Sequence, residues 1–187
     1  MKKWFYELVY RLVSAERIFG SSEKIENFVK VAVDGRIATG KAITLGCGVG
    51  RETIYLAKLG FEVTGLDFSP TAIKEARRRA KAAGMDIPFI VDDLTNLSRS
   101  LDSYDLVMDF GALNDLNQHD RDRYMNNVLP LIRPGGYYVM FCFDRMLTLA
   151  EVKQRFNEQF SIEVIDQIPG RRYPGTLTLY SMVRKQG

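Results

Sequence analysis

The 187-residue chain lacks what several classes of protein require. It contains two cysteines, Cys47 and Cys142, and one histidine, His119. Two thiols far apart in a chain of this size make no disulfide framework, and they predict reduced thiols in a cytoplasmic protein. Because histidine and cysteine do not cluster, we expect no metal site. We interpret His119, in a polar helix start, as a cap or an exposed residue, and Cys47 as a packing residue rather than a nucleophile.

Strong net charge and long apolar runs are missing as well. The formal net charge of +3 is too small to predict a nucleic-acid partner. The most basic stretch, residues 74–81, follows a helical pattern and is typical of a solvated helix face. No apolar run approaches the ~20 residues that span a bilayer, and charged residues interrupt the apolar N-terminal stretch, so we expect no secretory signal and no membrane. The sequence leaves open whether the protein is a monomer or a homodimer.

The composition is that of one globular domain. Hydrophobic residues make up 46% and charged residues 26%, and neither a repeat nor a Pro/Gly/Ser-rich linker marks a second domain. We expect a single domain over 1–187, with a helical cover at 1–39 and an α/β core at 40–187.

Strands alternate with helices along most of the chain. Apolar runs predict strands at 42–45, 61–66, 87–91, 104–110 and 137–143. Helical spacing, capping residues and glycines predict helices at 2–19, 22–34, from the glycine-rich turn to 59, 70–83, 119–132 and 147–159. The alternation predicts a parallel sheet with helices on both faces. Strands near 161–168 and 176–184 are joined by a connection too short for a helical crossover, so we expect an antiparallel hairpin. The fold class is α/β: a doubly wound, mostly parallel seven-stranded sheet with a C-terminal antiparallel hairpin.

The first strand runs directly into a glycine-rich turn, residues 46–50, and a helix follows. Glycines let the backbone turn tightly and let a ligand approach without meeting a Cβ. In open α/β sheets, ligands bind beyond the carboxyl ends of the strands. Asp67 ends the second strand there, where its carboxylate can accept hydrogen bonds from both ribose hydroxyls. These features predict a nucleoside-containing cofactor. A dinucleotide fingerprint would place glycine where Arg51 stands, which disfavours a nicotinamide oxidoreductase.

Together these stretches resemble the core of class I S-adenosylmethionine-dependent methyltransferases, which have a Rossmann-like fold. The resemblance covers about residues 40–185. It rests on Leu45-Gly46-Cys47-Gly48-Val49-Gly50-Arg51, residues 63–73, Asp92-Asp93-Leu94, residues 104–113 and residues 131–137. It implies methyl transfer with S-adenosylmethionine as the cofactor.

The resemblance also implies a role for each matching residue. The glycines would lie against the methionine part of the cofactor, Asp67 would hold the ribose, and Phe68 would pack near the adenine. Asp93 would receive the adenine amino group, or Asp92 if the register differs by one. The implied cofactor-binding set is Leu45, Gly46, Cys47, Gly48, Gly50, Asp67, Phe68, Asp92, Asp93, Leu94 (through its backbone NH), Asp109 and Phe110; the last two would also face the reacting centre.

One position departs from the family pattern. Related sequences carry Asp or Glu two residues before the first glycine, where the carboxylate helps to place the ammonium group of the cofactor, and Thr44 stands there in this chain. Without this carboxylate, either cofactor binding is weaker or the role passes to a main-chain carbonyl or to Asp109. A binding module without catalysis is the alternative.

We expect a small-molecule acceptor. The Asn/Asp-Pro-Pro-aromatic motif used to methylate base amino groups is replaced by Asp109-Phe110-Gly111-Ala112. No histidine base stands nearby, which favours a thiol or another soft nucleophile, and this region is similar to the thiopurine, thiol/halide and tellurite-resistance branch. An RNA or protein methyltransferase is the alternative. No catalytic residue is assigned; the candidate substrate contacts are Tyr6, Tyr10, Phe110, Asp144 and Arg145.

The N-terminal aromatic residues have two interpretations. They either pack in the core or form a lid over the cofactor, as related enzymes place a flexible cover ahead of the sheet. The set is Trp4, Phe5, Tyr6, Tyr10 and Phe19.

Overall fold

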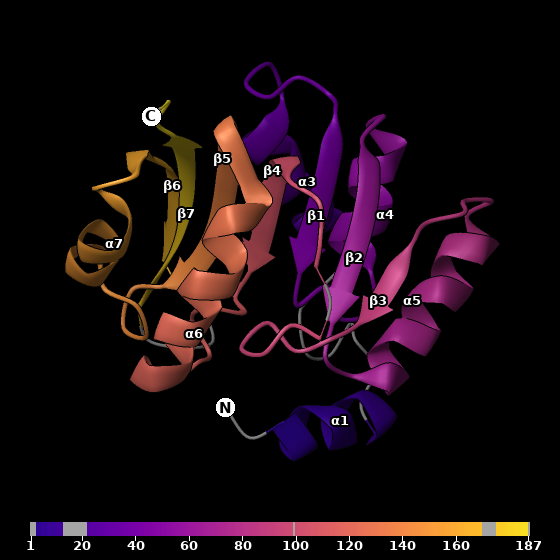
Figure 1. Ribbon diagram of the computed structural model, residues 1–187. Helices are drawn as coiled ribbons and strands as arrows, with labels where there is room; N and C mark the ends of the chain where they lie inside the picture. Colours follow the sequence, from indigo (N-terminus) through magenta and orange to yellow (C-terminus); the bar gives the residue numbers. More distant parts are fainter. Residues whose placement is uncertain (1–2, 13–21, 99, 170–174, 187) are drawn as a thin grey trace.

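A seven-stranded sheet organises the chain. The computed structural model describes residues 3–12, 22–98, 100–169 and 175–186 (Figure 1). The strand order is β3-β2-β1-β4-β5-β7-β6. The strands are β1 Lys41–Leu45, β2 Glu62–Asp67, β3 Phe89–Val91, β4 Tyr104–Phe110, β5 Ile132–Phe143, β6 Phe160–Pro169 and β7 Thr176–Arg184.

Strands β1 to β5 are parallel, and β7 lies antiparallel to both β5 and β6. The predicted fold class and its terminal antiparallel hairpin are therefore confirmed. The chain moves outward from β1 to β3 and then returns to place β4 on the other side of β1. This reversal of strand order creates a crevice at the carboxyl ends of β1 and β4, where open α/β sheets bind ligands.

The start of β5 differs from the prediction. The sequence predicts a strand from residue 137, but β5 begins at Ile132. Tyr104 pairs with Ile132, whereas Leu106 pairs with Tyr137, so the additional residues bulge out of the ladder. The preceding helix is shorter than predicted and ends in a single 3₁₀ turn, Leu129–Leu131, since Pro130 has no backbone N–H to continue it.

Helices cover both faces of the sheet, as predicted. They are α1 Lys3–Leu12, α3 Ser22–Val33, α4 Arg51–Lys58, α5 Pro70–Ala82, α6 Gln118–Val128 and α7 Leu149–Phe156. Neighbouring residues of β1 point to opposite faces: Ile43 packs in the cluster that contains residues of α6 and α7, and Ala42 packs in the cluster that contains residues of α3 and α4.

Of the described residues near the N-terminus, α1 and α3 lie in different places. In Figure 1, α1 lies beyond the carboxyl ends of the parallel strands, near the start of α5. In contrast, α3 packs beside α4 and contributes Val29, Ala32 and Val33 to the core. Residues 13–19 of the predicted first helix, with Phe19, lie outside the described residues. Among the described helices, none has the length and apolarity needed to cross a bilayer.

Candidate functional site

The turn after β1 depends on its glycines. Gly46, Gly48 and Gly50 have φ of 63°, 52° and 77°, in the left-handed region that favours glycine. A Cβ on Gly48 would lie 2.8 Å from the hydroxyl of Tyr10, a side chain of α1. The glycine loop therefore approaches the N-terminal helix closely enough for the missing Cβ to matter.

Asp67, the last residue of β2, is held against this loop. It is 2% exposed, and its two carboxylate oxygens accept hydrogen bonds from the backbone N–H of Gly48 at 2.8 Å and of Ser69 at 2.9 Å. Burial raises the pKa of Asp67 to about 6, and the charge of Glu7 adds to this effect. A carboxylate has about four lone-pair positions, so both oxygens keep accepting capacity for further donors.

The start of α5 fixes the residues around Asp67. Ser69 caps the helix by accepting a hydrogen bond from Ala72 N–H at 3.0 Å, and Pro70 occupies the first turn, as the sequence predicted. The same Ser69 hydroxyl donates to the Glu7 carboxylate, and so does the hydroxyl of Thr71. The middle of α1 is thereby attached to the beginning of α5.

The other attachment of α1 crosses the site. The Tyr6 hydroxyl donates to the carboxylate of Asp115, in the segment after β4. The Tyr6 ring also meets the Phe68 ring edge-on, with centroids 6.4 Å apart. Burial, together with Asp115, raises the pKa of Tyr6 above its usual range. With Glu7 on one side and Tyr6 on the other, α1 spans the crevice between α5 and the β4–α6 segment.

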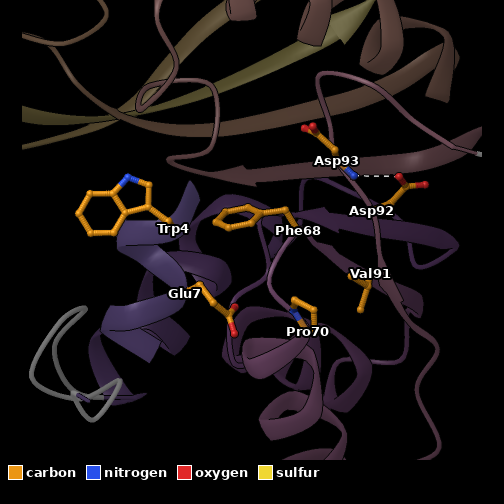
Figure 2. Close-up of a pocket in the computed structure, with 7 residues that line it drawn as sticks. All are labelled: Trp4, Glu7, Phe68, Pro70, Val91, Asp92 and Asp93. Carbon is orange, nitrogen blue, oxygen red and sulfur yellow. Dashed lines mark hydrogen bonds between the residues drawn. The ribbon is translucent and has the colours of Figure 1, made fainter. Parts of the chain in front are cut away.

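Three neighbouring cavities, each lined in part by α1, follow the carboxyl ends of the strands. The first has a volume of about 550 Å³ and is lined by Trp4, Glu7, Phe68, Pro70, Val91, Asp92 and Asp93 (Figure 2). The second has about 80 Å³, and shares Phe68, Asp92 and Asp93 with the first. The third has about 30 Å³, is lined by residues of the glycine loop together with Arg51 and Glu52, and shares Tyr10, Gly46 and Phe110 with the second.

Asp92 and Asp93 both line the first two cavities, but they bond differently. Asp92 accepts hydrogen bonds from its neighbour's N–H and from the N–H and hydroxyl of Ser98. Asp93 accepts from the N–H and hydroxyl of Thr95 through Oδ1. In Figure 2 the two carboxylates diverge.

Asp109 lies behind the site. It is fully buried, and it accepts hydrogen bonds from the hydroxyls of Tyr124 and Tyr138 and from the N–H groups of Ala112 and Leu113. Burial raises the pKa of Asp109, and these hydrogen bonds oppose the rise. The carboxylate thus shapes the segment after β4, and it does not line the three cavities.

The structure brings together most of the predicted cofactor set. The residues that line one or more of the three cavities are Gly46, Cys47, Gly48, Asp67, Phe68, Asp92, Asp93, Leu94 and Phe110. Leu45 is in the core, 1% exposed. Gly50 is the N-cap of α4, where a Cβ would meet Ala76 and Phe89 at 3.0 Å.

Some of the predicted substrate contacts line the cavities and others do not. Tyr6, Tyr10 and Phe110 line the second cavity. Asp144 and Arg145 line none of the three; Asp144 accepts a hydrogen bond from Thr176 N–H at 2.9 Å and ties the end of β5 to the start of β7.

Sequence reasoning missed several lining residues. The most consequential are Glu7, Glu52 and Asp115, carboxylates on α1, on α4 and after β4. Glu52 is the second residue after the glycine loop and Asp115 lies in the segment after Phe110, so their nearness in the sequence to predicted site residues was an available signal.

Family comparison agrees with this geometry. The profile of the family described as "Methyltransferase domain" matches residues 42–136, about half of the chain. The chain belongs to this family. The match runs from β1 into β5, and includes the glycine loop, Asp67 and the Asp92-Asp93 pair. The resemblance to class I S-adenosylmethionine-dependent methyltransferases is confirmed at this level.

Curated relatives are similar over part of their length. A 2-heptyl-1-hydroxyquinolin-4(1H)-one methyltransferase of Mycobacteroides abscessus is 27% identical over 63% of this chain and 52% of its own length. The methyltransferase GfsG of Streptomyces halstedii is 30% identical over 69% of this chain and 49% of its own length. The chain thus spans about half the length of these relatives.

Solved structures share the fold over nearly the whole chain. The N-methyltransferase NodS of Bradyrhizobium japonicum, in complex with S-adenosyl-L-homocysteine, has a TM-score of 0.80 at 19% identity, covering 97% of this chain and 98% of NodS. Magnesium protoporphyrin IX methyltransferase of Synechocystis, with bound SAM, has a TM-score of 0.77 at 19% identity, covering 98% and 92%.

Proposed function

We propose that this protein transfers a methyl group from S-adenosylmethionine to a small-molecule acceptor. The observation that carries the proposal is the position of Asp67, a buried carboxylate fixed by Gly48 and Ser69 where the cavities meet. Family membership supports methyl transfer.

The residues present fit the cofactor. Glycines at 46 and 48 leave room beside the loop, and Asp67 can accept from ribose hydroxyls. Phe68 offers an apolar face for the adenine, and Asp93 is the better candidate for the adenine amino group because Ser98 donates to both oxygens of Asp92. The charge also fits, since S-adenosylmethionine is cationic, and the charged residues lining the first two cavities are Glu7, Asp67, Asp92, Asp93 and Asp115.

We infer that α1 is the cover of this site. The second and third cavities, about 80 and 30 Å³, are far smaller than the ~300–1,000 Å³ of small-molecule sites. Tyr10 lies between α1 and the glycine loop, and Tyr6 reaches from α1 to Asp115 and Phe68. We propose that the methionine end of the cofactor enters these two cavities when α1 shifts outward, and that α1 then closes over the ligand and excludes water from the reacting centre.

The protein's contribution to the reaction is alignment. The cofactor supplies an already activated methyl group, so a nucleophile must be held in line with it, and such positioning lowers the barrier by several kcal/mol. Phe110, Tyr6 and Asp115 line the cavity on the side of β4. The preference for a thiol or other soft nucleophile rested on the lack of a histidine base. Because Asp115 brings a carboxylate to this side, a hydroxyl or amine acceptor has an adjacent proton acceptor as well.

Calorimetric titration with S-adenosylmethionine and S-adenosylhomocysteine tests the proposal. The native protein should bind both, and Asp67→Ala should bind about 100-fold more weakly, because two hydrogen bonds to a charged group contribute about 1.5 kcal/mol or more each. Asp67→Asn keeps the shape of the side chain and should also bind weakly. Asp34→Ala, an exposed position, is the matched control. If the folded native protein binds neither ligand, the proposal is wrong.

Labelled-methyl assays then identify the acceptor class. Thiols, phenols and amines are tested separately. Transfer to RNA or to protein, with none to small molecules, would contradict the small-molecule assignment.

A further inference from the structure

Thr44 does not take part in the site. It occupies the position at which related sequences carry an acidic residue, but it is 2% exposed and its hydroxyl lies 2.6 Å from the hydroxyl of Thr53. Neither threonine lines the three cavities. Asp109, the side chain to which the ammonium-binding role was expected to pass, is committed to Tyr124 and Tyr138 behind the site. If a carboxylate completes the methionine end, neither Thr44 nor Asp109 supplies it.

Glu52 reaches that end of the site. It is the second residue of α4, it is 9% exposed, and it lines the third cavity together with Gly48, Tyr10 and Phe110. Its backbone N–H and the charge of Arg51 are the interactions that favour its ionised form, and no side-chain hydrogen bond from the described residues adds to them. A buried carboxylate with so few donors is costly unless a cation pairs with it.

We propose that Glu52 holds the ammonium group of the cofactor, replacing the acidic residue that Thr44 lacks. This inference rests on the proposed function. It follows from the position of a buried carboxylate two residues after Gly50, in a cavity that Gly46 and Gly48 of the glycine loop also line. Arg51 lines the same cavity with the opposite charge. The cavity therefore presents partners for both charges of an amino-acid group.

Under two alternatives, Glu52 would not contact the ammonium group of the cofactor. An acidic residue in the first turn stabilises a helix through the helix dipole, and the carbonyl of Gly46 could receive the ammonium group instead. The three roles make different predictions about binding. Replacing Glu52 changes the affinity difference between a ligand with the amino group and one without it only if the Glu52 carboxylate contacts that amino group.

Calorimetry with two ligands and two proteins makes this comparison. The ligands are S-adenosylhomocysteine and its desamino analogue, which keeps the carboxylate. The native protein should bind the desamino analogue roughly 10- to 100-fold more weakly, the range for a hydrogen bond between charged groups. Glu52→Gln should bind both ligands alike, at about the native affinity for the desamino analogue. Glu62→Gln, exposed on β2, should behave like the native protein.

The outcomes separate this inference from the proposed function. If the native protein does not bind S-adenosylhomocysteine, both fail. If it binds and removal of the amino group weakens binding equally in native protein and Glu52→Gln, only the role of Glu52 is overturned. Glu52→Asp, which keeps the charge on a shorter side chain, provides a second variant should Glu52→Gln not fold; it should retain part of the discrimination, and full native discrimination would count against the assignment.

Discussion

Removing the charge of Glu52 should stabilise the ligand-free protein, by an amount that grows with pH. Burial raises the pKa of Glu52 from 4.5 to about 7. The folded-state pKa lies above the unfolded-state value, so its contribution to stability is fully present below about pH 4.5 and is lost as pH rises through 7. Above pH 8 the native state carries the whole penalty of an ionised, buried carboxylate.

The size of the penalty follows from the shift. About 2.5 pKa units at 1.36 kcal/mol each give a ceiling of about 3 kcal/mol. In a protein of this length, 1 kcal/mol moves the melting temperature by about 2–4 °C. Glu52→Gln should therefore melt up to about 6–12 °C above the native protein at pH 8.5, with most of that difference gone at pH 5.

Thermal unfolding by circular dichroism at pH 5, 6, 7 and 8.5 measures this difference. A glutamine that packs poorly would lower the melting temperature equally at every pH, so the pH dependence of the difference, rather than its absolute value, is the readout. Glu62→Gln should follow the native curve throughout. A melting-temperature difference between Glu52→Gln and native protein that is constant from pH 5 to 8.5 would refute the claim that Glu52 ionises at a cost in the folded state.

Two further substitutions test the support behind the site and the attachment of its cover. Asp109→Asn leaves at least one of the four donors around that carboxylate without an acceptor, at about 1–3 kcal/mol for each buried group, so the melting temperature should fall by about 2 °C or more; an unchanged value would show that the network around Asp109 adds no stability. Tyr6→Phe removes the hydroxyl that bonds to Asp115, and amide hydrogen exchange in α1 should quicken about 5- to 10-fold for a contact of about 1 kcal/mol. Equal exchange rates in the two proteins would mean that this contact does not hold α1 in place.

The sheet was predictable because its signals are local. Apolar runs, the glycine loop and the Ser69 cap each act over a few residues, and the short connection after β6 determines the hairpin. The bulge at the start of β5 was not predictable in this way. It depends on Tyr104 pairing with Ile132 while Leu106 pairs with Tyr137, and the sequence around Gly135-Gly136 is equally compatible with a turn.

Parts of the candidate site depend on contacts between distant segments. Tyr6 and Asp115 are 109 residues apart in the sequence, and their hydrogen bond helps to place α1 over the glycine loop. An acid in the first turn of a helix usually lies in solvent, so nothing local to Glu52 indicates that it is buried. Asp109 lies near the end of β4 as predicted, yet its carboxylate accepts hydrogen bonds from the hydroxyls of Tyr124 and Tyr138. These contacts with distant residues hold the carboxylate away from the cavities.

The pKa values of Asp67 and Glu52 are both raised, and this bears on how the position of α1 depends on a bound cofactor. Both carboxylates are buried beside the glycine loop, and burial is the largest cause of each shift. A closed α1 over two desolvated carboxylates therefore costs free energy in the ligand-free protein. A cationic ligand pairs with that charge and removes part of the cost, so its binding favours the closed position of α1. We therefore propose that these two carboxylates couple closure of α1 to the binding of the cationic cofactor, and a neutral ligand that fills the same space should close α1 less completely.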